Sequence, residues 1–307
     1  MSQKQERFQG QKTPLRLFLS WTAWPGLLIL CLSITAYGFS VGHPLIFFNV
    51  AYLILAVTLL FLERWMPHEP LWLPPDGQIW ADIGHTLTSK GTVQAILIFG
   101  GVIGLSELIK PVSVPMDALW PREWPMAAQV VLGLVVAEFG LYWAHRVAHE
   151  WPPLWPYHAV HHSVKKLWIV NTGRFHFIDS LISIVLGSGV LFATGAPLEV
   201  IQWLSAITAF IGMLTHCNVE MRFGVLSWVF NTPELHRWHH SKDLSEGDKN
   251  YGENVMLWDW IFFSHYNQKR RPPLDIGIKE EMPPRFLQQL KYPFTAEIRW
   301  KNKDFSQ

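Results

Sequence analysis

The sequence predicts an all-α integral membrane protein, a bundle of about four to six membrane helices arranged in hairpins beneath a histidine-rich helical cap. Three observations predict this class. Half of the 307 residues are hydrophobic and 16% are charged, whereas about a quarter of the residues of a soluble domain are charged. Apolar runs long enough to cross a bilayer recur along the chain. Histidines gather in short motifs near the ends of these runs.

The first two apolar runs predict a helical hairpin. A polar tail over residues 1–20 precedes an uncharged run from Trp21 to Gly42, which is too long for the core of a signal peptide. His43 and Pro44 interrupt the pattern, and a second run continues to Leu62. Lysines and arginines flank both ends of the hairpin and are absent from its turn. The positive-inside rule therefore predicts that both ends lie in the cytoplasm.

The middle of the chain predicts the remaining membrane helices. A weaker apolar segment covers residues 91–109, and a longer helix begins at Met126 and ends at Glu150 with the first pair of histidines. If both cross the bilayer, this pair returns to the cytoplasmic side. Two further runs, 177–194 and 198–214, are separated by Gly-Ala-Pro and predict another hairpin.

We expect one membrane domain. It consists of the tail, anchor helices and linkers over 21–125, a core over 126–265 and a polar C-terminal tail over 266–307. The N-terminus, the C-terminus and the histidine motifs are all expected on the cytoplasmic side. The membrane is the cytoplasmic (inner) membrane if the source is bacterial, and an ER-type membrane if it is eukaryotic.

The bulk composition excludes some partners. The 25 Lys and Arg residues nearly balance the 24 Asp and Glu residues, so nucleic acid is not an expected partner. The two cysteines, Cys31 and Cys217, both lie in apolar segments. This placement argues against a disulfide framework and against a cysteine-based zinc site.

The histidine motifs predict a metal site. The pair His145 and His149 is spaced HxxxH, so both rings lie on one helix face. The motif HxxHH then occurs twice, and one more histidine stands where the last apolar helix ends; these residues are His158, His161, His162, His236, His239, His240 and His216. Nine imidazoles exceed the four ligands of a tetrahedral zinc, so two metals fit the count better.

Iron is favoured over the other metals that take nitrogen ligands, which are zinc, copper and nickel. The zinc-protease motif HExxH needs Glu after its first histidine, but Arg146 stands there. A paired iron site near the membrane surface can activate dioxygen, and the C–H bonds of a lipid chain need such a metal. The sequence has no GxGxxG, CxxCH or iron–sulfur cysteine motif. The electrons are therefore expected from a separate partner or a diffusible reductant.

Five stretches together resemble the fatty acid hydroxylase/sterol desaturase superfamily of membrane di-iron oxygenases. They are HRVAHE (145–150), HAVHHS (158–163), HCN (216–218), TPELHRWHHS (232–241) and KNYGENVMLWDWIF (249–262). Among the branches of this superfamily, HRVAHE and NTPELHRWHH are most similar to the alkylglycerol monooxygenases. One departure follows the Trp-Asp pair, where many members have WDxxFGT and this chain has Phe263 or Ser264 in place of the glycine.

The resemblance implies site residues. It implies a di-metal centre of two iron ions bound by His145, His149, His158, His161, His162, His236, His239 and His240, with His216 as a ninth ligand. It implies weaker roles for His176, for His85, which is equally compatible with a helix cap, and for Asn218 as holder of a metal-bound water. Metal-bound imidazoles usually donate their other N–H to a carboxylate or carbonyl. The favoured acceptors are Glu150 and Glu220, and further candidates are Glu138, Asp179 and Asp243.

The sequence thus favours an O2-dependent di-iron lipid oxygenase. It hydroxylates or desaturates an unactivated C–H bond of a fatty acyl, alkyl or sterol substrate, with an external electron donor. Two alternatives stay open at this point. One is a membrane zinc hydrolase, and the other is a non-catalytic metal-binding membrane protein.

Overall fold

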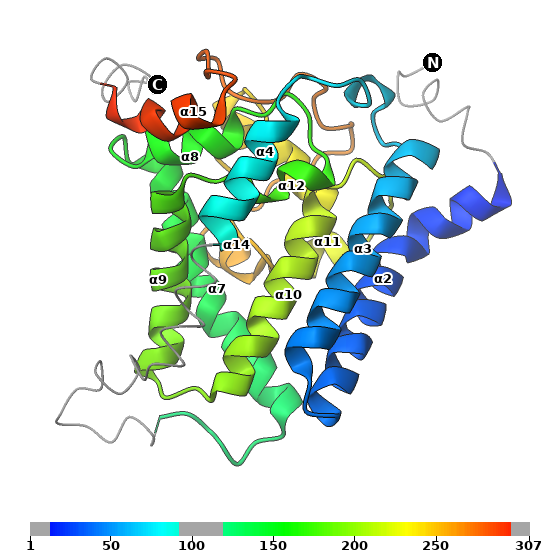
Figure 1. Ribbon diagram of the computed structural model, residues 1–307, viewed down its shortest axis with the longest axis vertical. Helices are drawn as coiled ribbons and strands as arrows, with labels where there is room; N and C mark the ends of the chain where they lie inside the picture. The colour runs from blue at the N-terminus through cyan, green and yellow to red at the C-terminus, as the bar shows by residue number, and fades with distance from the viewer. Residues whose placement is uncertain (1–12, 92–118, 296–307) are drawn as a thin grey trace.

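The computed structural model describes residues 13–91 and 119–295, and in these ranges the protein is helical, with isolated β-bridges and no β-sheet (Figure 1). The long helices are α2 (Pro14–Ser40), α3 (Pro44–Trp65), α7 (Met126–Glu150), α9 (Phe177–Ala193) and α10 (Leu198–His216). The shorter ones are α4 (Ile79–His85), α8 (Trp155–His162), α11 (Leu226–Val229), α12 (Pro233–His239), α13 (Leu244–Gly247), α14 (Leu257–Ile261) and α15 (Phe286–Lys291). Single turns of other helix types cover Pro70–Trp72, Thr86–Lys90, Ile169–Gly173 and Tyr292–Phe294.

Four helices of the described chain, α2, α3, α7 and α10, are long and apolar enough to cross a membrane. Helix α9 is also apolar but has 17 residues. These helices confirm the predicted class, a membrane helical bundle. The predicted apolar segment 91–109 lies, except for its first residue, outside the described residues.

The predicted first hairpin is formed by α2 and α3, which pack along their length. Helix α2 begins seven residues before the apolar run, because Thr13 accepts a hydrogen bond from the N–H of Arg16 and Pro14 occupies the first turn, both favourable at a helix start. Pro25 lies inside α2, and a proline removes one helical hydrogen bond. Figure 1 shows the bend in this helix.

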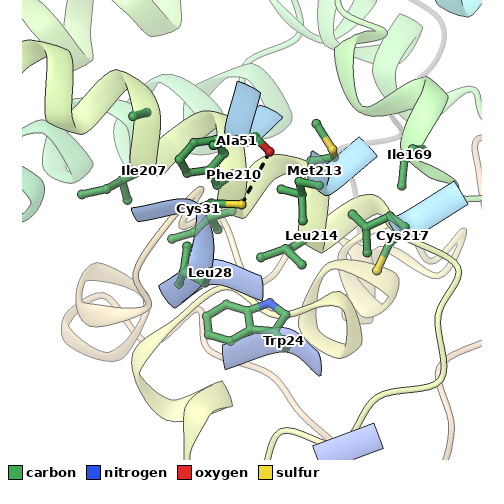
Figure 2. Packing of buried hydrophobic residues seen from close by; sticks show 14 of the residues in the cluster. Trp24, Leu28, Cys31, Ala51, Ile169, Ile207, Phe210, Met213, Leu214 and Cys217 are labelled. Carbon is green, nitrogen blue, oxygen red and sulfur yellow. Dashed lines mark hydrogen bonds between the residues drawn. The ribbon is translucent and has the colours of Figure 1, made fainter. Parts of the chain in front are cut away.

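The core of the bundle lies between this hairpin and α10. Trp24, Leu28 and Cys31 of α2 are buried against α3 and α10, as Figure 2 shows. The Cys31 thiol lies 3.7 Å from the carbonyl of Ala51 in α3. A thiol that behaves as a small apolar group suits this position, so neither cysteine has a metal role in the fold.

Helix α7 stands between α9 and α10 and packs on both. The two runs predicted as a second hairpin are therefore held chiefly against α7 rather than against each other. At the α7–α9 crossing, a Cβ atom on Gly140 would lie 2.1 Å from the carbonyl oxygen of Leu186, and one on Gly187 would lie 2.7 Å from Leu141. Small residues allow such close helix contact in membranes.

The remaining short helices form a cap at one end of the bundle. Figure 1 shows α4, α8, α12 and α15 at its upper end, where α7 and α10 deliver their last residues. Glu63, buried near the end of α3, accepts hydrogen bonds of 2.9 Å from the N–H groups of Ile169 and Asn218. This carboxylate ties the first hairpin to the segments that carry the histidines.

Candidate metal centre

The nine motif histidines converge in two groups in the cap. The first group is His145, His149, His158, His162 and His239, and the second is His161, His216, His236 and His240. Within each group, one ligand atom from every residue lies within 4.8 Å of all the others. All nine residues are buried.

The two groups are direct neighbours. The rings of His162 and His240, one from each group, stack with centroids 4.3 Å apart. Inside the first group, the Nε2 atoms of His149 and His162 are 3.0 Å apart. Inside the second, the Nε2 atom of His236 lies 2.9 Å from that of His216. The arrangement suits two metal positions side by side.

Four helices supply the groups, and helix periodicity decides which ring goes where. The i, i+4 pair of α7 points both rings into the first group, as the 3.6-residue repeat requires. Helix α8 is divided: His158 and His162, also i, i+4, face the first group, and His161 faces the second. Helix α12 is divided in the same way, because His239 faces the first group and His236 the second. The HxxHH spacing thus lets one short helix serve two sites.

Most of the rings are oriented by a hydrogen bond from Nδ1 away from the groups. His145 and His239 donate to the carbonyls of Tyr251 and Lys249, both at 2.7 Å. His161 donates to the carbonyl of Arg174 at 3.2 Å.

Three further partners are side chains. His149 is paired with Asp248 at 3.0 Å, His158 with Asp179 at 2.9 Å, and His216 with the Oδ1 atom of Asn171 at 3.1 Å. Such outer bonds fix the tautomer that leaves Nε2 available for a metal.

Several ring nitrogens of the two groups have no hydrogen-bond partner among the described residues, although in the second group Nε2 of His236 lies 2.9 Å from that of His216 and 3.1 Å from that of His240. Nε2 of His145, His158 and His239 and Nδ1 of His236 and His240 are buried without a hydrogen-bond partner in the part of the chain that the structure describes. Buried polar atoms are almost always paired, so these five atoms are ready to bind something else. An all-imidazole donor set fits iron, zinc, copper or nickel.

The electrostatics of the groups also suit a metal. Burial, followed by the neighbouring imidazoles, holds the pKa of His161, His162, His236 and His240 well below the usual histidine value. The pKa of His239 is lowered in the same way. Neutral imidazole is the form that binds a metal, so the site is prepared for one without first losing protons.

Three residues with predicted minor roles lie outside both groups. His176 caps α9: its Nδ1 accepts from the N–H of Ile178, and its Nε2 donates to the carbonyl of Leu290, both at 3.2 Å. His85 has both ring nitrogens engaged, at 3.0 Å from the Phe175 carbonyl and 3.0 Å from Gln289. These two histidines are a helix cap and a structural link, because neither presents a nitrogen to the groups.

The third of these residues, Asn218, is bonded to the linker that follows α3. Its amide is paired with the backbone of Glu69 in both directions, at 2.9 and 3.0 Å, so it is not turned toward a metal-bound water. It connects the linker after α3 to the chain that follows α10.

The two carboxylates favoured as partners of the histidines have other partners. Glu150 accepts a hydrogen bond of 2.9 Å from Arg146, one helical turn before it. Glu220 is paired with His68 at 2.8 Å and with Arg271 at 3.0 Å. Of the wider candidates, Asp179 does bond a site histidine, whereas Glu138 binds the loop at 253–254 and Asp243 caps α13.

Several supporting residues escape sequence reasoning. Asp248 and Asn171 bond site histidines, yet Asp248 follows α13 and Asn171 lies in the turn Ile169–Gly173, where no sequence motif links either residue to its partner. Arg174 is buried and paired with the buried Asp82 at 2.9 Å, and it also donates to Ser163 at 2.9 Å. The sequence does not reveal the Arg174–Asp82 pair, because its two members are 92 positions apart in the chain and meet only in the folded structure.

The protein has clear relatives. The fatty acid hydroxylase family profile matches residues 130–264. The chain is 49% identical over 282 residues to the ornithine lipid hydroxylase OlsE of Rhizobium tropici, and the alignment covers 90% of this chain and 84% of that protein. This chain belongs to the fatty acid hydroxylase family. It is therefore an oxidoreductase enzyme, and its histidine groups are the metal-binding feature of the fold.

More distant relatives agree with the predicted branch. The chain is 31% identical to human alkylglycerol monooxygenase over 160 residues, which is 51% of this chain and 34% of that protein. It is 28% identical to the alkylglycerol monooxygenase of Xenopus tropicalis over 160 residues, which is 52% of this chain and 34% of that protein. The chain thus spans about a third of these relatives. No solved structure matches this fatty acid hydroxylase family member.

Proposed function

We propose that this protein hydroxylates a membrane lipid with dioxygen, at a site where the two histidine groups hold two iron ions. One observation carries the proposal: in each of two adjacent groups of buried imidazoles, one ring nitrogen from every histidine lies within 4.8 Å of the others, and six of the nine rings are bonded to the protein through Nδ1. A single mononuclear site needs no second group. The proposed ligands are the five histidines of the first group for one ion and the four of the second for the other.

The proposed substrate is an ornithine-containing lipid. OlsE, named as an ornithine lipid hydroxylase, aligns with 90% of this chain. Hydroxylation is favoured over desaturation because the named relatives are hydroxylases or monooxygenases. A membrane lipid also suits a site at the end of membrane-spanning helices.

In this proposal, the bound metal pair supplies the activation of dioxygen that side chains cannot perform. The protein's own residues hold and shield the site. Asp179 and Asp248 fix the rings of His158 and His149, which raises the basicity of their inner nitrogens. Burial of all nine rings excludes bulk water, which limits side reactions. Electrons come from an external donor, either a separate protein or a diffusible reductant.

The proposal includes a topology. Both ends of the first hairpin carry Lys and Arg, and its turn carries none, so the histidine cap is placed on the cytoplasmic side. The membrane is then the inner membrane in a bacterium, or an ER-type membrane in a eukaryote. The site belongs to the proposed core, residues 126–265, within a single domain.

Lipid mass spectrometry tests the proposal. Cells that make ornithine lipids express the wild type, His161→Ala or His43→Ala, the last changing an exposed histidine in the α2–α3 turn. We expect an ornithine lipid heavier by one oxygen with the wild type and His43→Ala, and none with His161→Ala. Growth under 18O2 should place the heavy isotope in the product.

Metal analysis of the purified enzyme accompanies the lipid measurement. We expect about two iron ions per chain, since the two groups are the proposed sites. A lipid lighter by two hydrogens identifies a desaturase instead. Zinc alone, with product formed without oxygen, contradicts the proposal and favours a hydrolase. Unchanged lipids in cells with iron and oxygen contradict it as well.

A further inference from the structure

Two short helices outside the candidate membrane spans share an exposed apolar surface. It is formed by Val225, Trp228, Val229, Leu257, Trp260, Ile261 and Phe263, which we name the apolar pad. Val225 and Trp228 are 78% and 65% exposed, and Phe263 is 89% exposed. Contiguous exposed apolar surface of this kind usually marks a site of interaction.

The pad is one structural unit, because its two helices are joined. The N–H of Met256 donates to the carbonyl of Val229 at 2.9 Å, and Phe230 and Val255 form a β-bridge. The indole N–H of Trp260 donates to the carbonyl of Trp228 at 2.9 Å, and the two indole rings lie 5.2 Å apart. The indole N–H of Trp260 thus has a partner within the protein and does not require a hydrogen bond to water.

The exposed face of the pad carries no charge. Within residues 223–231 and 255–263, the only ionisable side chain of Asp, Glu, Lys, Arg or His type is that of Asp259. It is fully buried and accepts hydrogen bonds from the N–H groups of Tyr251 and Gly252, at 2.8 and 2.7 Å. An uncharged surface with two tryptophans suits the boundary between lipid and water.

The pad also lies at the level of the membrane-spanning helices. Trp258 of α14 donates its indole N–H to the carbonyl of Val135 at 3.0 Å and packs on Phe139. Val135 lies ten residues before His145, or about 15 Å along α7. Helix α14 packs on α7, and Figure 1 shows it below α8, α12 and α15. The pad therefore continues the lipid-facing surface of α7.

Phe263 has a backbone conformation that favours glycine. Its φ is +57°, a region that is unfavourable for bulky side chains. It stands at the point where many members of the superfamily have glycine. Because the ring is almost fully exposed, packing inside the protein does not offset this strain. The N–H groups of Ser264 and His265 donate to the carbonyl of Asp259 and close the end of α14 around this conformation.

We propose that the apolar pad, with Phe263 at its tip, inserts into the acyl chains beneath the lipid headgroups and adds a lipid contact to those of the four spans. The inference does not depend on which reaction the site performs. It does connect the bilayer to the site, since Asp259 binds the N–H of Tyr251, whose carbonyl accepts from His145. Lipid contact and a site histidine share one short loop.

Site-directed spin labelling of the full-length protein tests the proposal. Cys31 and Cys217 are both buried, so a nitroxide reagent reacts at an introduced cysteine. Phe263→Cys probes the pad, Leu53→Cys in α3 is the matched lipid-exposed control, and Ser245→Cys in α13 is the water-exposed control. Each is labelled and reconstituted in palmitoyl-oleoyl phosphatidylcholine vesicles.

Collisions with oxygen, which concentrates in acyl chains, are compared with collisions with a water-soluble nickel chelate. We expect the Phe263→Cys label to behave as the Leu53→Cys label does, with oxygen the stronger relaxant. A label relaxed mainly by nickel, as expected for Ser245→Cys, overturns the proposal. Val225→Cys probes the same pad from the start of α11, and it decides the outcome if Phe263→Cys does not give folded protein.

Discussion

In six of the nine site histidines, a hydrogen-bond partner of Nδ1 decides which ring nitrogen is presented to the site. For His158 and His149 that partner is a carboxylate, from Asp179 and Asp248. For His145 and His239 it is a backbone carbonyl at 2.7 Å. The carboxylates are the members of this outer layer that a substitution can remove without disturbing the backbone.

Asp179→Asn and Asp248→Asn should therefore weaken metal binding. Loss of such a partner typically lowers metal affinity or activity roughly 10- to 100-fold. Iron content and a competition assay with a chelator measure the effect. Glu150→Gln is the control, because this carboxylate is adjacent to His149 in sequence but bonds Arg146. Equal losses in all three variants would show that the pairings with Asp179 and Asp248 do not position the rings.

The left-handed backbone conformation of Phe263 should make this residue costly for the stability of the protein. Phe263→Gly removes the cost of a left-handed bulky residue, roughly 1–2 kcal/mol, so the thermal midpoint in detergent should rise. Phe262→Ala next to it should lower the midpoint, because the Phe262 ring packs on Tyr142 and Trp143 at 5.4 and 5.1 Å. A fall for Phe263→Gly would mean that contacts of its side chain, with the protein or with the detergent, outweigh the backbone cost.

Among the elements, the crossing of α7 and α9 has the strictest geometry. Helix α7 carries His145 and His149, and α9 carries Asp179 in its first turn. Gly140 brings the two backbones together, since its Cβ position lies 2.1 Å from a backbone oxygen of α9. The crossing thus holds α9, whose Asp179 bonds His158 of α8, next to the two histidines of α7.

Gly140→Ala should force the two helices apart and destabilise the protein by roughly 1–3 kcal/mol, the usual cost of overpacking. Gly189→Ala in α9 is the matched control, because no atom lies within 4 Å of its added Cβ. That variant should be neutral or gain about 0.5–1 kcal/mol from helix propensity. Thermal unfolding in one detergent compares them, and a similar response to both substitutions would exclude a tight crossing.

The long elements were predictable from the sequence and the short ones were not. A membrane helix needs about 20 apolar residues, and such runs predicted α2, α3, α7 and α10. Helices α11 and α14 have four and five residues, which is too short for a periodic pattern. They form because contacts with α7 and with the chain at 251–256 position them, and these tertiary contacts have no pattern in the sequence.

At the scale of the whole molecule, the nine site histidines were predictable because repeated spacing on a helix fixes direction as well as identity. Their division into groups of five and four was not, because His161 and His162 are neighbours in sequence and serve different groups. His176 and His85 show the opposite case. Each is a buried histidine, but partners near the start of α9 and within α15 occupy both of its nitrogens.

The distribution of the site over the chain leads to a prediction for metal removal. The groups join α7, α8, α10 and α12, whereas the α2–α3 hairpin supplies no histidine to them. Metal bound to the folded state alone stabilises it by about 2.7 kcal/mol at a hundredfold excess over Kd. Treatment with a chelator should therefore loosen the cap and leave the hairpin closed.

Hydrogen–deuterium exchange with peptide resolution measures this difference. After chelation, exchange should rise in peptides that cover 145–162 and 233–241, with little change over 44–65, and added ferrous iron should restore the protection. His161→Ala, which removes a ligand from the second group, should exchange in the cap like the chelated wild type. Uniform exchange along the chain would mean that the metal holds the whole bundle, and unchanged exchange would mean that the hydrogen bonds around the histidines are sufficient to hold the cap.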